Sequence, residues 1–172
     1  VPGAIKNGYS LFEEKLNKGD KIGGVAFYFR DYPIRKKYAV AVNVGNLYVN
    51  HGLFLNQALK DVNYISEDEY HFYFADTDLA LKIKEKGYDI VASSTSFVEH
   101  YFEATPEIRA SNNDDKKEKD RLWLIEKWAG KAYSIEDKEK YKKTVGYWDF
   151  FEGDYIDKTN RIDLLMRSSE NV

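Results

Sequence analysis

The chain has no cysteine among its 172 residues, which excludes disulfide bonds and zinc sites built on thiolates. Proline is scarce, at three residues, and no apolar run approaches the roughly 20 residues that a membrane-spanning helix needs. The N-terminal segment has no apolar core of the kind found in signal peptides. Together these absences fit a cytoplasmic bacterial protein, including one that sits peripherally at the inner face of the membrane.

The charge and the missing motifs exclude several function classes. The formal net charge of -3 argues against a protein that binds nucleic acid by neutralising its phosphates. The sequence contains no Walker loop, no G-x-G-x-x-G and no G-x-S-x-G motif. What it has in abundance is aromatic side chains, which make up 16% of the residues. Such rings supply either a core or a face that stacks on sugars.

Hydrophobic periodicity predicts one α/β domain. A Ser-x-x-Glu capping box at Ser10 predicts a helix that ends at Gly19. Strands are predicted at 23–30, 37–44, 70–75, 89–92 and 96–98, and further helices at 51–61, 77–86, 112–130 and 134–143. Strands and helices alternate early and helices dominate late, which indicates an α/β layer with a helical C-terminal extension. The aromatic tail from Thr144 is expected to dock on the body.

The most informative segment is 72–100. An apolar, strand-like run there delivers Asp76 and Asp78 to the start of a helix, and a second apolar run ends on His100. A helix N-terminus keeps a carboxylate ionised, as a general base must be. The alternative is that both aspartates simply cap the helix, which acidic residues at this position commonly do.

Histidines supply the other candidate site residues. His100 can be a neutral imidazole ligand for a divalent metal, or an ordinary rim residue at a strand end. His71 alternates with apolar neighbours and is expected to be a strand residue, whereas His51 starts a predicted helix and can face a cleft. A zinc site built from these residues has no recognisable ligand spacing. A weaker hypothesis is a metal-dependent hydrolase that uses Asp76, Asp78 and His100 together.

The order of these motifs resembles the C-terminal half of family-two glycosyltransferases of the GT-A fold. The segments that carry the resemblance are ADTDLALKI at 75–83, GYDI at 87–90 and VEH at 98–100, with GGVAFYFR and VNVGNLYVNHGLF upstream and LWLIEKWAG downstream. The resemblance covers roughly residues 22–130. It implies a partial GT-A fold, a mixed sheet with flanking helices, over 1–130 and a helical, aromatic extension packed on it over 131–172.

The resemblance implies roles for individual residues. Asp76 matches the catalytic base, which deprotonates an acceptor hydroxyl that attacks the anomeric carbon of a nucleotide sugar with inversion. His100 matches a histidine that, in some members, completes a Mg²⁺ or Mn²⁺ site on the donor diphosphate. Gly45 and Asn46 lie where the family places residues near the donor sugar. Asp78 is expected to assist substrate binding or to cap the helix.

Asp76, Thr77 and Asp78 also spell the D-x-D that binds metal and nucleotide diphosphate in GT-A enzymes. We favour the base position because the residues before Asp76 lack the opening strand and turn of a nucleotide-binding half. Ala75 stands where the family usually has Glu, which weakens an acceptor contact. The nucleotide-binding half with its own D-x-D is then expected outside this chain, as part of a longer enzyme or on another polypeptide.

The leading hypothesis from the sequence is therefore a glycosyltransferase of cell-surface polysaccharide biosynthesis. It uses a nucleotide sugar and a glycan or other hydroxyl acceptor. The alternative is a non-catalytic module that presents the same half-fold to a saccharide or a partner protein. Metal-dependent binding of nucleoside diphosphates distinguishes the two, because only the enzyme requires it.

Overall fold

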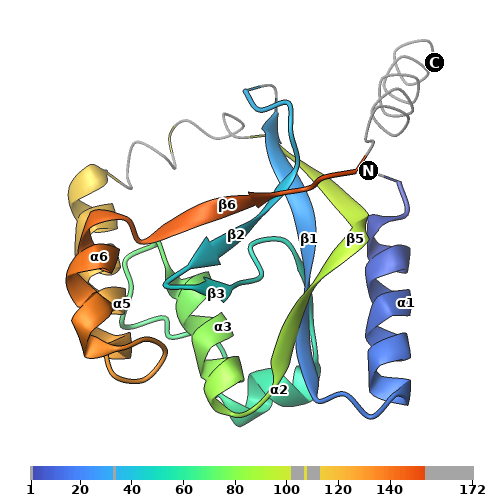
Figure 1. The fold of residues 1–172 in the computed structure, drawn as a ribbon, viewed down its shortest axis with the longest axis horizontal. Coiled ribbons are helices and arrows are strands. Elements are labelled where there is room, and N and C mark those ends of the chain that lie inside the picture. The colour runs from blue at the N-terminus through green and yellow to red at the C-terminus, as the bar shows by residue number, and fades with distance from the viewer. Residues whose placement is uncertain (1, 33, 102–106, 108–112, 154–172) are drawn as a thin grey trace.

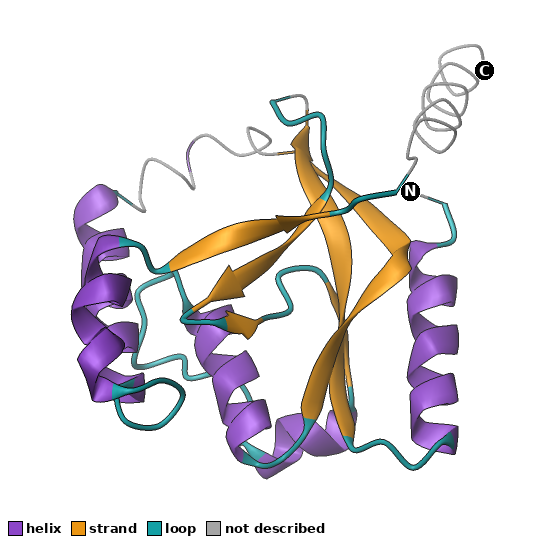
Figure 2. Cartoon of the chain, viewed as in Figure 1, coloured by secondary structure: helices purple, strands orange, loops and turns teal. Residues whose placement is uncertain are grey.

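The structure is a computed structural model, and it describes residues 2–32, 34–101, 107 and 113–153. These residues form a mixed α/β fold on one six-stranded, mostly antiparallel sheet, drawn in Figure 1 and Figure 2. The strands are β1 (Ile22–Tyr32), β2 (Ala39–Asn43), β3 (Asn46–Leu47), β4 (Gly52–Phe54), β5 (Asp89–Tyr101) and β6 (Gly146–Phe150). The helices are α1 (Ala4–Asn17), α2 (Asn56–Asp61), α3 (Ala75–Glu85), α5 (Asp114–Trp128), the 3-10 helix η1 (Ile135–Asp137) and α6 (Lys138–Lys143). The predicted mixed α/β class is confirmed, and the GT-A identity stays a prediction.

Strand β1 lies at the centre of the sheet. β5 runs parallel to it from the Ile22–Asp89 pair to the Tyr32–Tyr101 pair. On the other side of β1, β4 and β2 pair with it antiparallel, and β2 also pairs with β3 and β6. Because parallel strands end at the same edge of a sheet, the C-terminal ends of β1 and β5 lie side by side.

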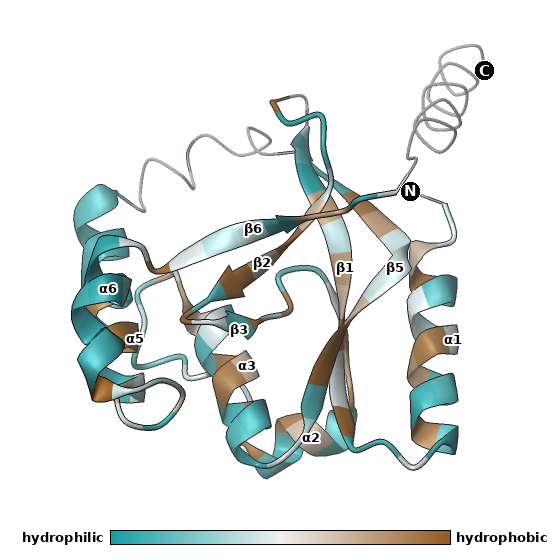
Figure 3. Ribbon diagram, viewed as in Figure 1, coloured by the Kyte–Doolittle hydropathy of each residue, from teal (hydrophilic) through white to brown (hydrophobic). Residues whose placement is uncertain are grey.

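Helices cover both faces of β1 and β5. Side chains alternate along a strand, so Val25 and Phe27 pack toward α1 while Ala26 packs in the core under α2 and α3. A Cβ atom at Gly8 would lie 2.3 Å from the Phe27 ring, so this glycine lets α1 approach the sheet closely. Figure 3 shows hydrophobic residues along the inner strands and a hydrophilic outer surface on α6, which buries no residue.

The predicted first helix is present, but it begins before Ser10. α1 starts at Ala4, after Gly3 in a left-handed conformation, and Ser10 lies inside the helix. Ala4 and Phe12 are both buried against the sheet. Packing of this apolar side, rather than the capping box, therefore sets where α1 starts.

The predicted strand at 70–75 is wrong. The backbone N–H groups at 71–73 donate to the Asp120 carboxylate instead of to a neighbouring strand. Phe74 adopts a left-handed conformation with φ 64°, and α3 begins at Ala75. His71 is consequently a loop residue.

Two other predicted elements change in type or extent. The predicted helix at 51–61 is helical in α2, but its first part forms β4. Gly52 explains this, because a Cβ there would lie 2.0 Å from the Val25 carbonyl oxygen and only glycine fits against β1. The strands predicted at 89–92 and 96–98 are one strand, β5, with a register shift opposite Phe27 and Tyr28.

The C-terminal part combines predicted helices with a strand that was not predicted. α5 confirms the helix at 112–130 within the described residues, with Asn113 as its N-cap, and Asn112 lies outside them. η1 and α6 account for 134–143. The described part of the aromatic tail, up to residue 153, lies against the body as β6, paired with β2. Residues 154–172 lie outside the described part, and no described helix is long and apolar enough to cross a membrane.

Candidate functional site

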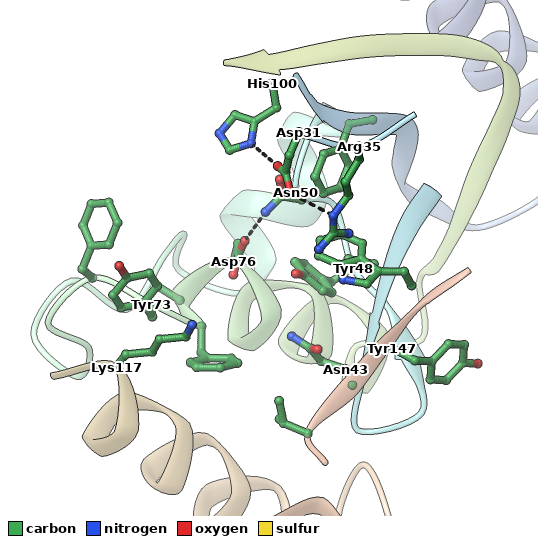
Figure 4. A pocket seen from close by; sticks show the side chains of 18 of the residues that line it. Asp31, Arg35, Asn43, Tyr48, Asn50, Tyr73, Asp76, His100, Lys117 and Tyr147 are labelled. Carbon is green, nitrogen blue, oxygen red and sulfur yellow. Dashed lines mark hydrogen bonds and ion pairs between the residues drawn. The ribbon is translucent and has the colours of Figure 1, made fainter. Parts of the chain in front are cut away.

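A cleft of about 760 Å³ opens at the sheet edge where β1 and β5 end (Figure 4). Its walls come from these strand ends, the loop before α3, the first turns of α5, and β6. Aromatic and amide side chains dominate the lining: Phe29, Asn43, Tyr48, Asn50, Phe72, Tyr73, Phe74, Tyr101, Tyr147 and Trp148. Of the predicted site residues, Asp76 and His100 line this cleft, and they come from different elements.

Asp76 lies in the first turn of α3, two residues after the left-handed Phe74. Its Oδ1 accepts the Thr77 backbone N–H at 2.7 Å, and its Oδ2 accepts the Asn50 side-chain amide at 3.2 Å. Burial raises the pKa of the Asp76 carboxyl, and the hydrogen bonds from Thr77 and Asn50 oppose this only in part. A partly buried carboxylate with a raised pKa is a stronger base than an exposed one.

His100 is joined to Asp31 across the parallel strand pair. The two residues are register partners on β5 and β1, and His100 Nδ1 lies 2.8 Å from Asp31 Oδ1. The other Asp31 oxygen lies 3.3 Å from Arg35 Nε. Because an ionised carboxylate can only accept, the contact places a proton on Nδ1, and a neutral ring then carries its lone pair on Nε2. This orientation by a carboxylate is common for histidines that bind metals.

His51 contacts the rings of His100 and Phe29, and the three rings form a small cluster. The His51 ring centroid is 5.1 Å from that of His100 and 4.7 Å from that of Phe29. Burial, assisted by the neighbouring His100, lowers the pKa of His51 to about 4. His51 is therefore neutral at neutral pH. It was expected to face a cleft, but it does not line this one.

Gly45 and Asn46, predicted near a donor sugar, lie away from the cleft. Gly45 lies in the turn between β2 and β3, where Val44 and Gly45 have φ 44° and 75°, and Asn46 begins β3. Asn46 Oδ1 accepts Lys84 Nζ at 2.9 Å, and its amide donates to the Val44 carbonyl. A Cβ at Gly45 would lie 3.0 Å from the Tyr141 hydroxyl, so this turn packs against α6.

Asp78 also lies outside the cleft, because it is fully buried between α3 and α5. It accepts hydrogen bonds from Trp128 Nε1 at 2.8 Å, Tyr70 OH at 3.1 Å and Ser66 Oγ at 3.0 Å. Lys127 Nζ lies 2.9 Å from the same carboxylate. These partners give Asp78 a structural role in joining the two helices.

No protein-family model, curated protein or solved structure matches this chain. What the cleft can do follows from its own geometry. It combines one basic carboxylate, an oriented histidine, amide groups and exposed rings.

Sequence reasoning missed several residues of the cleft. Asp31 lies near the C-terminal end of β1 and pairs with His100 only through the parallel register of β1 and β5, which the sequence does not specify. Asn50 directly precedes the predicted helix at 51–61, and nothing in the sequence indicates that its side chain contacts Asp76. Trp148 belonged to the recognised aromatic tail, but its place in the cleft depends on the pairing of β6 with β2.

Proposed function

We propose that this chain is the acceptor side of an inverting glycosyltransferase. The acceptor hydroxyl binds in the cleft and gives its proton to Asp76. Its oxygen forms a bond to the anomeric carbon of the donor sugar as the bond from that carbon to the nucleoside diphosphate breaks. The observation that carries this proposal is a partly buried carboxylate with a raised pKa, facing a cleft of about 760 Å³.

The lining of the cleft supports a saccharide as the acceptor. Phe72 and Tyr147, which both line the cleft, expose 56% and 62% of their surface. The same lining includes hydrogen-bonding side chains, those of Asn43, Tyr48 and Asn50. Rings that pack on the C–H faces of a sugar, with amides that bind its hydroxyls, form a site suited to a carbohydrate.

His100 fits a metal site as one contributing ligand. Its Nδ1 is held by Asp31, which is the arrangement expected of an imidazole that ligates through Nε2. Among the described residues, no group of three or more His, Cys, Asp or Glu side chains is arranged to hold a metal. We propose that the remaining ligands come from the donor diphosphate and from the nucleotide-binding half. A bound Mg²⁺ or Mn²⁺ would neutralise charge on the leaving diphosphate.

Replacing Trp148 by Ala is expected to weaken saccharide binding by about tenfold, since a lost stacking contact costs on the order of 1 kcal/mol. The measurement is a titration of the ¹⁵N-labelled chain with mono- and oligosaccharides, followed by NMR. Trp123→Ala is the matched control, because this ring on α5 is 47% exposed and does not line the cleft. Saccharide-induced shifts that avoid the Asn50 and Trp148 side chains would contradict the assignment.

A second candidate is a saccharide-binding module without catalysis, which the aromatic lining alone would also serve. Calorimetry with nucleoside diphosphates and Mn²⁺, on the polypeptide that carries both halves, separates the two. Micromolar, metal-dependent binding supports the transferase. Saccharide binding with no nucleotide binding in that polypeptide supports the module.

A further inference from the structure

Asp120 on α5 is a buried carboxylate with an unusual set of partners. It is 1% exposed, and it accepts the backbone N–H groups of His71, Phe72 and Tyr73, each at 2.9 Å. The His71 side chain is a fourth partner, with its Nδ1 2.8 Å from Asp120 Oδ1. Although burial opposes ionisation, these hydrogen bonds outweigh it and lower the pKa of Asp120. The group is therefore a charged acceptor held by four donors from one loop.

This loop, residues 71–74, forms one wall of the cleft and leads directly to Asp76. Phe72, Tyr73 and Phe74 line the cleft, and α3 begins one residue later. The residues at 71–73 belong to no strand, so no sheet ladder fixes their backbone. The donation of three consecutive N–H groups to one carboxylate replaces such a ladder, and hydrogen bonds to a charged acceptor are stronger than those between neutral groups.

Helix α5 holds the neighbouring part of α3 as well. Trp128 Nε1 and Lys127 Nζ bind Asp78, two residues after Asp76. Lys117, one turn before Asp120, lines the cleft. α5 therefore contacts the loop, the start of α3 and the cleft from one rigid element, as Figure 4 shows for Lys117 beside Tyr73.

We propose that Asp120 is a positioning residue of this site, which fixes loop 71–74 and thereby the acceptor wall and the environment of Asp76. Its catalytic consequence rests on the proposed transferase function, whereas its effect on the loop and on Asp76 does not. Asp120 acts through the loop, since it does not itself line the cleft. Loosening the loop would admit water to Asp76 and misplace the rings that contact the acceptor.

The test replaces Asp120 by Asn, which has the same size but turns an N–H toward the loop amides. The first readout is the ¹³C NMR titration of the Asp76 carboxyl in the chain without ligand. We expect the Asp76 pKa to fall toward its ordinary value and the Phe72 and Tyr73 amide signals to shift. Asp120→Glu is the second variant. It keeps an anionic acceptor, so it is expected to fold, while its extra methylene displaces the loop.

The control is Asp115→Asn, an exposed position on the same helix, which should leave the Asp76 titration unchanged. The second readout uses the complete transferase, where Asp120→Asn should raise the acceptor KM by about tenfold, as expected for one lost hydrogen bond to a charged group. Donor KM should change little.

The two readouts separate the failure of this proposal from the failure of the transferase assignment. If Asp120→Asn shifts the Asp76 titration but the unmodified polypeptide transfers no sugar, the positioning role is supported and the transferase is rejected. Folded Asp120 variants with an unchanged Asp76 titration and unchanged loop signals overturn the positioning role. If Asp120→Asn does not fold, Asp120→Glu decides by the same criterion.

Discussion

Replacing Asp76 by Asn is expected to slow sugar transfer by about 10²- to 10⁴-fold, the range that a general base contributes. The Asn oxygen can still accept the Thr77 N–H, and the Asn50 amide can turn to present its oxygen, so the cleft should keep its shape. What is lost is the group that takes the acceptor proton. The measurement is the initial rate of nucleoside diphosphate release by the polypeptide that carries both halves of the transferase.

The matched control for this variant is Asp68→Asn, which changes the same atoms in an exposed loop. It should transfer sugar at the normal rate. An Asp76→Asn enzyme that turns over within a few fold of the unmodified one would contradict the role of Asp76 as base.

The same Asp76→Asn variant is expected to be more stable than the unmodified chain at neutral pH. The pKa of Asp76 is raised in the folded state, so this group contributes stability at low pH that is lost as the pH rises through its folded pKa. Asn carries no charge to desolvate. The gain in melting temperature should therefore be largest at neutral pH and should shrink as the pH falls below the folded pKa of Asp76. A gain that grows on acidification would contradict the burial of this charge.

Replacing Asp78 by Ala is expected to lower the free energy of unfolding by about 3 to 5 kcal/mol, the usual cost of removing one partner of a buried ion pair. Asp78 is fully buried, and its removal leaves Trp128 Nε1 and the Tyr70 hydroxyl without their acceptor. Lys127 would keep its contact with Glu69 alone. The contact between α3 and α5 should weaken as a result.

Chemical denaturation measures this loss as a lower midpoint at unchanged slope. Glu85→Ala is the control, because it lies exposed on the same helix and should change stability by less than about 0.5 kcal/mol. A loss below about 1 kcal/mol in Asp78→Ala would show that the Asp78 contacts do not join the helices.

Local patterns predicted the elements whose partners lie close in sequence or whose faces are strongly apolar. β1 and β2 follow from alternation, and α3 follows from its apolar stripe and the Gly87 that ends it. Asp76 and His100, two of the candidate residues from the sequence, both line the cleft. The parallel pairing of β5 with β1 is what returns His100 there.

The wrong predictions, the strand at 70–75 and the site role of Asp78, concern residues whose partners are distant in sequence. The aromatic run before Asp76 has a strand's composition, but its N–H groups find a carboxylate 47 to 49 residues away on α5. Asp78 has the spacing of a site residue, yet Trp128, 50 residues later, buries it. No local signal reports either contact, so the loop and the role of Asp78 could not be predicted.

The most direct test of the proposed function is ¹H NMR of a reaction between a nucleotide sugar and a saccharide acceptor, catalysed by the polypeptide that carries both halves. We predict a product with inverted anomeric configuration, formed at least about 100-fold more slowly when Asp76 is replaced by Asn. A product with retained configuration, or equal rates for the two proteins, would contradict this prediction.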